Sequence, residues 1–173
     1  MTAPVLRTER LTLRRPEPQD LEPFVAFCAS ERSRWIGGPA PREDAWEGFA
    51  LNLGHWEMLG FGYFHAELTK TGAPVGRVGL RQQEGKPEPE VAYSIYSDEL
   101  EGLGLATEAA CACRDWAFGA LNMPTLVSYI DPDNIRSQAV ARRMGAWIDP
   151  DAPRWPSHST LEVWRHPRTG ALS

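Results

Sequence analysis

The segment that most constrains the fold is the loop at residues 101–108, Glu-Gly-Leu-Gly-Leu-Ala-Thr-Glu, where two glycines stand directly before a helical pattern. Residues 90–96 have strand character, and small side chains then recur at helical spacing to about Gly119. A short β-rich run follows at residues 125–130. Strand, helix, strand in this order predicts a βαβ unit with a right-handed crossover and two parallel strands.

The glycine loop has the chemistry of an anion site. Free backbone N–H groups at the start of a helix, together with the helix dipole, suit a pyrophosphate, and Gly102 and Gly104 let a ligand approach the backbone closely. A Walker loop would need Lys followed by Ser or Thr, and a dinucleotide fingerprint would need a third glycine and an early place in the sheet. The sequence therefore excludes both of these motifs, whereas an ordinary helix that merely begins with glycines stays as an alternative interpretation.

The rest of the chain supplies more strands and helices. Alternation predicts a strand at residues 11–15, and aromatic and β-branched content predicts a hairpin of strands at 61–69 and 75–81. Further predicted elements are helices at 21–28, 43–59 and 134–144, and a strand at 161–164. We therefore expect an α/β fold with a mixed, mostly antiparallel sheet, helices on both faces, and one domain over residues 1–173.

Composition narrows the function classes. The net charge of -5 and the pI near 5.4 argue against broad binding to nucleic acid or to an anionic membrane. The amino-terminal residues hold no apolar run long enough for a signal peptide or a membrane span, so we expect a cytoplasmic protein. The spacing of Cys28, Cys111 and Cys113 resembles neither a disulfide framework nor a zinc site, and no metal is predicted.

A second polar segment, Asp-Pro-Asp-Asn-Ile-Arg-Ser at residues 131–137, follows the second strand of the crossover. Taken alone, Asn134 is a good helix cap and Ser137 a surface hydroxyl. Taken with the glycine loop, the segment resembles the GNAT superfamily of N-acetyltransferases, and within it the group of ribosomal-protein N-terminal acetyltransferases. The resemblance spans nearly the whole chain and is carried by three motifs in the same order, at residues 8–14, 102–109 and 131–145.

The resemblance implies acetyl-CoA as cosubstrate and direct transfer of the acetyl group to a primary amine, on a protein N-terminus or a small molecule. It implies that the strands ending near residues 96 and 130 splay apart, and that the pantetheine arm pairs with the backbone of Ser94, Ile95 and Tyr96. Asn134 and Ser137 would contact the pantetheine end. The pyrophosphate would be held by the loop residues Gly102, Leu103, Gly104, Leu105, Ala106 and Thr107.

The chain departs from the family at three positions. Glu101 stands where relatives commonly have Gln, Arg or Trp, and Leu103 where they have a basic or polar residue, so phosphate binding would rely on backbone donors. Ala141 stands near the tyrosine that serves many relatives as general acid, which leaves proton delivery to Ser137, to water or to no group. A catalytically silent CoA-binding regulatory module is therefore the alternative function.

The candidates for general base are Glu90, Glu67, His55 and His65. We rank Glu90 first because it lies four residues before Ser94 and so on the same strand face, although it could equally be a solvated strand end.

Most aromatic residues of the acceptor-side segments should be core and a remnant should line the acceptor site: Trp35, Trp46, Trp56, Tyr63, Phe64 and Tyr129. The acidic balance suits a cationic amine. The sequence identifies neither the acceptor nor the oligomeric state, with a homodimer among the alternatives.

Overall fold

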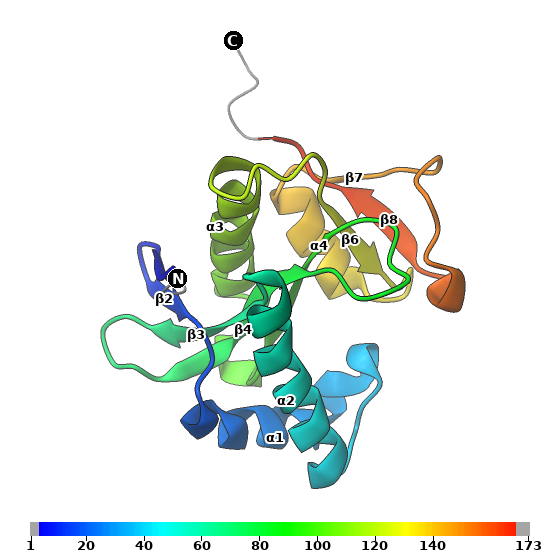
Figure 1. Ribbon diagram of the computed structural model, residues 1–173. Helices are drawn as coiled ribbons and strands as arrows, with labels where there is room; N and C mark the ends of the chain where they lie inside the picture. The colour runs from blue at the N-terminus through cyan, green and yellow to red at the C-terminus, as the bar shows by residue number, and fades with distance from the viewer. Residues whose placement is uncertain (1–3, 169–173) are drawn as a thin grey trace.

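The computed structural model describes residues 4–168, and residues 1–3, where the amino-terminal segment begins, lie outside it (Figure 1). The described residues form one eight-stranded mixed sheet in the order β1-β2-β3-β4-β5-β6-β8-β7. The strands are β1 (Leu6–Arg7), β2 (Leu11–Arg14), β3 (Tyr63–Leu68), β4 (Pro74–Arg81), β5 (Glu90–Ile95), β6 (Val127–Ile130), β7 (Trp147–Ile148) and β8 (Glu162–Arg165). The α-helices are α1 (Leu21–Cys28), α2 (Arg42–Leu59), α3 (Leu105–Gly119) and α4 (Ile135–Arg143). The 3-10 turns are η1 (Pro18–Asp20), η2 (Glu31–Ile36), η3 (Asp98–Leu100) and η4 (Pro156–His158).

The predicted mixed sheet is confirmed. β5 and β6 run parallel, joined through α3, and the other neighbouring strands pair antiparallel. The two strands that the sequence did not predict, β1 and β7, have two residues each. An alternation of apolar and polar residues cannot be recognised over so short a length.

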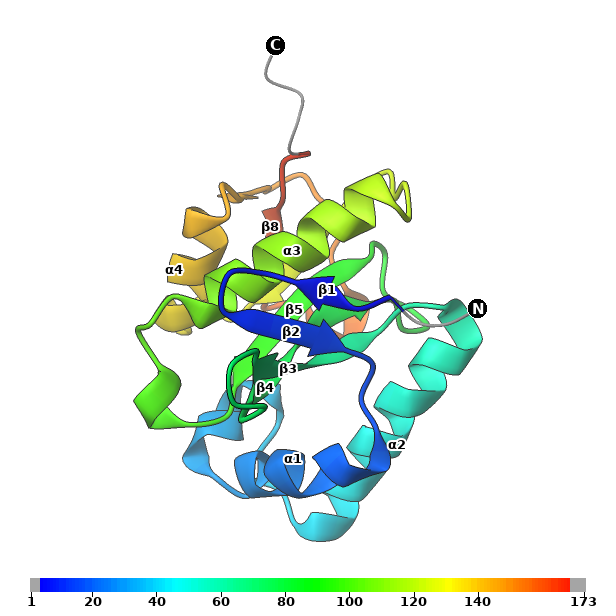
Figure 2. The ribbon, with the colours of Figure 1, turned by 90° about the vertical axis from the view of Figure 1, so that its left-hand side faces the viewer.

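Helices cover both faces of the sheet. Figures 1 and 2 show α3 and α4 on one side and α1 and α2 on the other. The small residues Ala109, Ala110 and Cys113 of α3 are fully buried in the core cluster that holds Val78 and Val91 of the sheet, because a helix with short side chains can lie close to a sheet. A separate apolar cluster joins α1 to α2.

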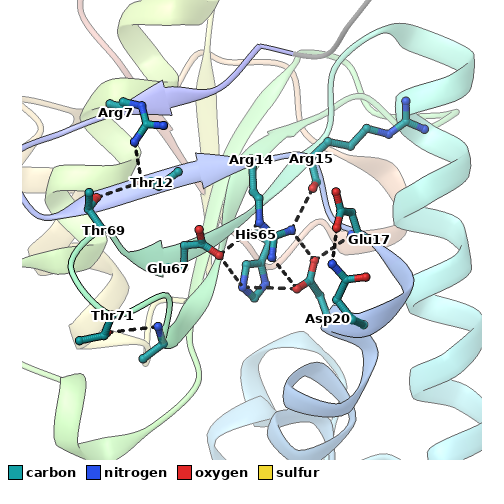
Figure 3. A network of polar contacts seen from close by, with 12 residues as sticks. Arg7, Thr12, Arg14, Arg15, Glu17, Asp20, His65, Glu67, Thr69 and Thr71 are labelled. Carbon is teal, nitrogen blue, oxygen red and sulfur yellow. Dashed lines mark hydrogen bonds and ion pairs between the residues drawn. The ribbon is translucent and has the colours of Figure 1, made fainter.

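A network of charged residues attaches the α1 layer to the sheet (Figure 3). Arg14 at the end of β2 donates to both carboxylate oxygens of Asp20, at 2.7 and 2.8 Å, and its Nε donates to Glu67 of β3 at 3.2 Å. His65 Nε2 lies 3.6 Å from the same Asp20 carboxylate. Because Asp20 immediately precedes α1 and is only 5% exposed, this network determines where α1 begins relative to the sheet.

The sheet opens between β5 and β6. Within the described chain the two strands are in register only at Glu90 and Val127. Ser128 Oγ then donates to the Val91 carbonyl at 2.7 Å. Beyond this contact, towards Ile95 and Ile130, no ladder pair joins the strands in the described part of the chain. The predicted splay is therefore present, and it leaves strand peptide groups without a neighbouring strand.

Within residues 4–168 no helix combines the length and the apolar composition that crossing a bilayer needs.

Candidate active site

An open cleft of about 1240 Å³ crosses the splayed strands. One end lies at the amino end of α3, where residues of the glycine loop line it. The other end lies between β4 and η4, where charged and aromatic side chains from β4, β5 and β6 form the wall. A single cleft thus joins the predicted phosphate loop to the predicted acceptor side.

The backbone amides of residues 102–107 have no acceptor in the part of the chain that the structure describes. Among residues 4–168, none of these six N–H groups donates a hydrogen bond, whereas the flanking amides of Glu101 and Glu108 donate to Asp98 and Gly104. Gly102 and Gly104 have φ angles of 76° and 78°, which favour glycine. The Thr107 hydroxyl is also buried and has no hydrogen-bond partner in the described part of the protein. Buried or clustered donors without partners at a helix start are suited to phosphate oxygens.

The loop is attached to the turn between β1 and β2. The Glu108 carboxylate accepts hydrogen bonds from Thr8 Oγ1 at 2.5 Å, from the Arg10 backbone at 2.8 Å and from Arg10 Nε at 2.7 Å. Arg10 Nη1 donates in turn to the Leu103 carbonyl at 2.8 Å. Burial by itself raises the pKa of Glu108, but these hydrogen bonds outweigh burial and bring the pKa below its ordinary value. The first and second sequence motifs therefore meet at one ionised carboxylate.

Glu101 brings positive charge to the loop. Its carboxylate binds Arg32 Nη1 at 2.7 Å and Arg136 Nε at 2.7 Å. Arg32, from η2, also donates to the Ile95 carbonyl at 3.1 and 3.2 Å and pairs with Asp98. The sequence predicted that an acid here weakens the field for phosphate. In the folded chain the same acid holds two guanidinium groups beside the cradle.

Only part of the predicted pantetheine strand faces the opening. The Tyr96 amide donates to the Val75 carbonyl at 2.9 Å, and the Ser94 carbonyl points at Gly76 of β4. Because successive peptide groups of a strand point to opposite neighbours, those of Tyr93 and Ile95 face the gap towards β6. Ser94 and Ile95 both line the cleft.

Most of the remaining predicted cofactor residues line the cleft, and two do not. Gly102, Gly104, Leu105, Ala106, Thr107, Asn134 and Ser137 line the cleft. Asn134 caps α4 by accepting the Ser137 amide at 3.2 Å. Tyr96 and Leu103 are not among the cleft-lining residues of the described chain: Tyr96 stacks on Phe27 with ring centroids 5.0 Å apart, and Leu103 contributes its carbonyl to Arg10.

Glu90 is the one base candidate that the described cleft contains. It is 7% exposed and forms an ion pair with Lys86. Lys86 lies 4.4 Å from the centre of the Trp155 ring and 5.4 Å from that of Tyr129. Burial, together with the nearby Arg81 guanidinium, lowers the pKa of Lys86 to about 7. The sequence analysis missed Lys86, because a lysine in a loop rich in Gly and Pro is ordinarily solvated.

The other base candidates have structural partners. His55 donates from Nδ1 to the Phe61 carbonyl at 2.7 Å and accepts the Gln82 amide at Nε2 at 3.1 Å. Burial lowers the pKa of His55 and of His65. Glu67 pairs with Arg14 in the network of Figure 3.

Hydroxyl groups are the candidate proton donors. Ala141 is fully buried in a cluster with Ile130, Ala146 and Trp164 and does not line the cleft. Ser137 of α4 does line it, as does Tyr129, whose buried hydroxyl has no hydrogen-bond partner within the described residues.

The aromatic residues are divided between the core, the cleft and the surface, so the expectation that most of them are core is wrong. Trp56 and Phe64 belong to the main core cluster, whereas Trp35, Tyr63 and Tyr129 line the cleft. Trp46 does neither and is 57% exposed. Trp155, which the sequence analysis did not select, completes the wall around Lys86.

A sheet opened between two parallel strands, with free amides at the start of the crossover helix, defines the class of transferases that bind acyl-CoA. The chain belongs to the GNAT acetyltransferase family: the family model described as "Acetyltransferase (GNAT) domain" matches residues 10–146. Members of this family use acetyl-CoA, and no group of His, Cys, Asp or Glu within residues 4–168 could hold a metal ion.

The chain is also similar to individual proteins. An acetyltransferase from Agrobacterium tumefaciens str. C58 is 42% identical, with a TM-score of 0.90 over 97% of this chain and 96% of that one. The uncharacterized protein YkkB of Bacillus subtilis is 27% identical over 87% of this chain and 89% of its own length. RimL, a ribosomal L7/L12 α-N-protein acetyltransferase solved with coenzyme A, is 13% identical with a TM-score of 0.75 over 95% and 98%, a likeness of fold alone.

Proposed function

We propose that the protein is an N-acetyltransferase that moves the acetyl group of acetyl-CoA to a primary amine by direct attack, without a covalent enzyme intermediate. The observation that supports this best is the row of amides at residues 102–107 that have no hydrogen-bond acceptor in the described part of the chain, beside strands that separate after Glu90. The amides would hold the pyrophosphate, with Arg32 and Arg136 nearby, and the strand peptides of Tyr93 and Ile95 would pair with the pantetheine arm.

The cleft residues suggest a role for each proton. The attacking amine must lose a proton, and the Glu90 carboxylate would accept it, directly or through water. A new C–N bond then forms, the C–S bond breaks, and the departing thiolate takes a proton from Ser137 or from water. A peptide N–H of Tyr93 or Ile95 would stabilise the developing oxyanion, an interaction worth about 3 kcal/mol at the transition state.

Two measurements test the proposal together. Calorimetry with acetyl-CoA tests binding, and release of CoA thiol tests transfer to a panel of protein N-terminal peptides and small amines. Glu90→Gln should lower kcat about 100-fold or more while acetyl-CoA still binds, and Glu47→Gln, an exposed acid on α2 that does not line the cleft, should change neither. Binding without turnover on any amine would favour the silent CoA-binding module, and absence of binding would reject both functions.

A further inference from the structure

Two arginines on β4 line the cleft and have no ion-pair partner among the residues that the structure describes. Arg77 is 9% exposed, and its guanidinium lies 4.8 Å from the centre of the Phe24 ring and 4.3 Å from that of Tyr63. Arg81 is half-buried and lies 5.5 Å from the same Tyr63 ring. Within residues 4–168 neither guanidinium makes a hydrogen bond or an ion pair, and the Nε of Arg77 is buried without an acceptor.

The carboxylates on the same sheet face have other partners. Glu90 lies opposite Arg81 in the β4–β5 register, yet it pairs with Lys86. Asp20 and Glu67 both bind Arg14 (Figure 3). Contacts with aromatic rings compensate part of the cost of burying a guanidinium. The rings do not accept hydrogen bonds from the N–H groups that lie in the plane of the guanidinium. An acceptor on a ligand would therefore satisfy the N–H donors of Arg77.

The two guanidiniums share contacts with one aromatic ring. Alternation places Arg77, Gly79 and Arg81 on one face of β4. Gly79 pairs with Ala92 of β5 on one side and with Tyr63 of β3 on the other, and the Tyr63 ring contacts both guanidiniums. Glu90, opposite Arg81 on β5, lines the same cleft, and the splayed end of β5 leads from it to the glycine loop.

We infer that the acceptor is an amine that also carries a carboxylate, with the carboxylate bound by Arg77 and Arg81 and the amino group directed to Glu90. The inference rests on the proposed N-acetyl transfer and names its substrate class. A guanidinium held against two rings presents its N–H groups in one plane, which matches the planar carboxylate in a bidentate contact. The overall negative charge suggested a cationic acceptor, but the local charge at this end of the cleft is positive.

Matched pairs of amines test the inference. Free α-amino acids are compared with their carboxamides and with the corresponding aminophosphonates, by CoA release and by thermal shift of the CoA-bound protein. We expect kcat/KM for the acids to exceed that for the carboxamides about 100-fold. Arg77→Gln should lower kcat/KM for the acids and so remove this preference. Arg42→Gln, an arginine of α2 that pairs with Glu22 outside the cleft, should keep the preference.

The stability of the free protein supplies an independent readout. Because the Arg77 charge has no ion-pair partner within residues 4–168, Arg77→Met should leave the melting temperature unchanged or raise it. A fall of several degrees would show a structural role for the ring contacts and would overturn the inference.

The ligand panel can overturn it as well. The inference fails if acids and carboxamides bind and react alike, if no acid raises the melting temperature more than its carboxamide, or if the phosphonates are preferred. These results leave acetyl-CoA binding and acetyl transfer to amines intact, whereas a failure of the proposed function appears as no acetyl-CoA binding in the calorimetry or as binding with no CoA release on any amine.

Discussion

Replacing either Lys86 or Glu90 alone with an apolar residue should destabilise the protein more than replacing both. The side chains of Lys86 and Glu90 are 1% and 9% exposed and form an ion pair in the wall of the cleft. Lys86→Met leaves a buried carboxylate and Glu90→Leu leaves a buried ammonium, while the double variant leaves neither charge. The pair can therefore be examined as a double-mutant cycle.

The expected magnitude follows from the burial of the two groups. Removing one partner of a buried ion pair costs about 3–5 kcal/mol, whereas replacing both with apolar residues is often neutral. A chain of this length loses about 2–4 °C of melting temperature per kcal/mol, so each single variant should melt about 6–20 °C below the wild type. The double variant should melt within about 4 °C of it.

Thermal and urea unfolding at pH 6, where the Lys86 ammonium is charged, measures the cycle, and unfolding at pH 7 and 9 measures its pH dependence. In the native state the pKa of Lys86 is lowered to about 7, below its unfolded value of about 10.4. The unfolded state binds more protons between these values, so wild-type stability should rise with pH across this window, and the rise should be absent in Lys86→Met. Two single variants whose losses simply add in the double variant would refute the reasoning.

Three further changes probe the loop and the α1 junction. Glu108→Gln removes a charged partner of the half-exposed Arg10 and should cost about 1 kcal/mol of stability, with weaker acetyl-CoA binding by calorimetry. Glu101→Gln frees two guanidiniums and should tighten acetyl-CoA binding about threefold at low salt, an effect that 0.5 M salt should remove. Burial raises the pKa of Asp20, but its hydrogen bonds lower it below the ordinary value. Asp20→Asn should cost about 2–3 kcal/mol at pH 7. Native Asp20 should contribute above pH 4 and lose its contribution as the pH falls through its native pKa, an acid-limb loss that the variant lacks.

The regular elements of the fold were predictable because each has its own period. The alanine stripe of α3 and the aromatic hairpin of β3 and β4 repeat over enough residues to distinguish helix from strand. The anion cradle was predictable for the same reason, since two glycines before a helix leave local amides free.

The charges of the site were not predictable in this way. Lys86 and Glu90 are four residues apart, but what makes the pair notable is burial under Trp155, which lies far along the chain. Arg32 binds Glu101, from which it is separated by 69 positions in the sequence. Glu101 lowers the positive charge of the loop sequence, but in the folded protein its carboxylate binds two arginines. Ser94 and Tyr96 were assigned to the cofactor strand without knowing which peptide groups β4 occupies.

The sequence by itself determined the order of strands and helices, the glycine cradle and the three motifs that resemble the acetyltransferase family. Each depends on backbone geometry or side-chain periodicity over a few residues. Only the tertiary structure decided which amides stay free, which carboxylates are neutralised and which arginines keep an open fork towards the cleft. Burial and ion pairing are set by contacts between distant segments, because desolvation depends on everything packed around a group and not on its neighbours in the chain.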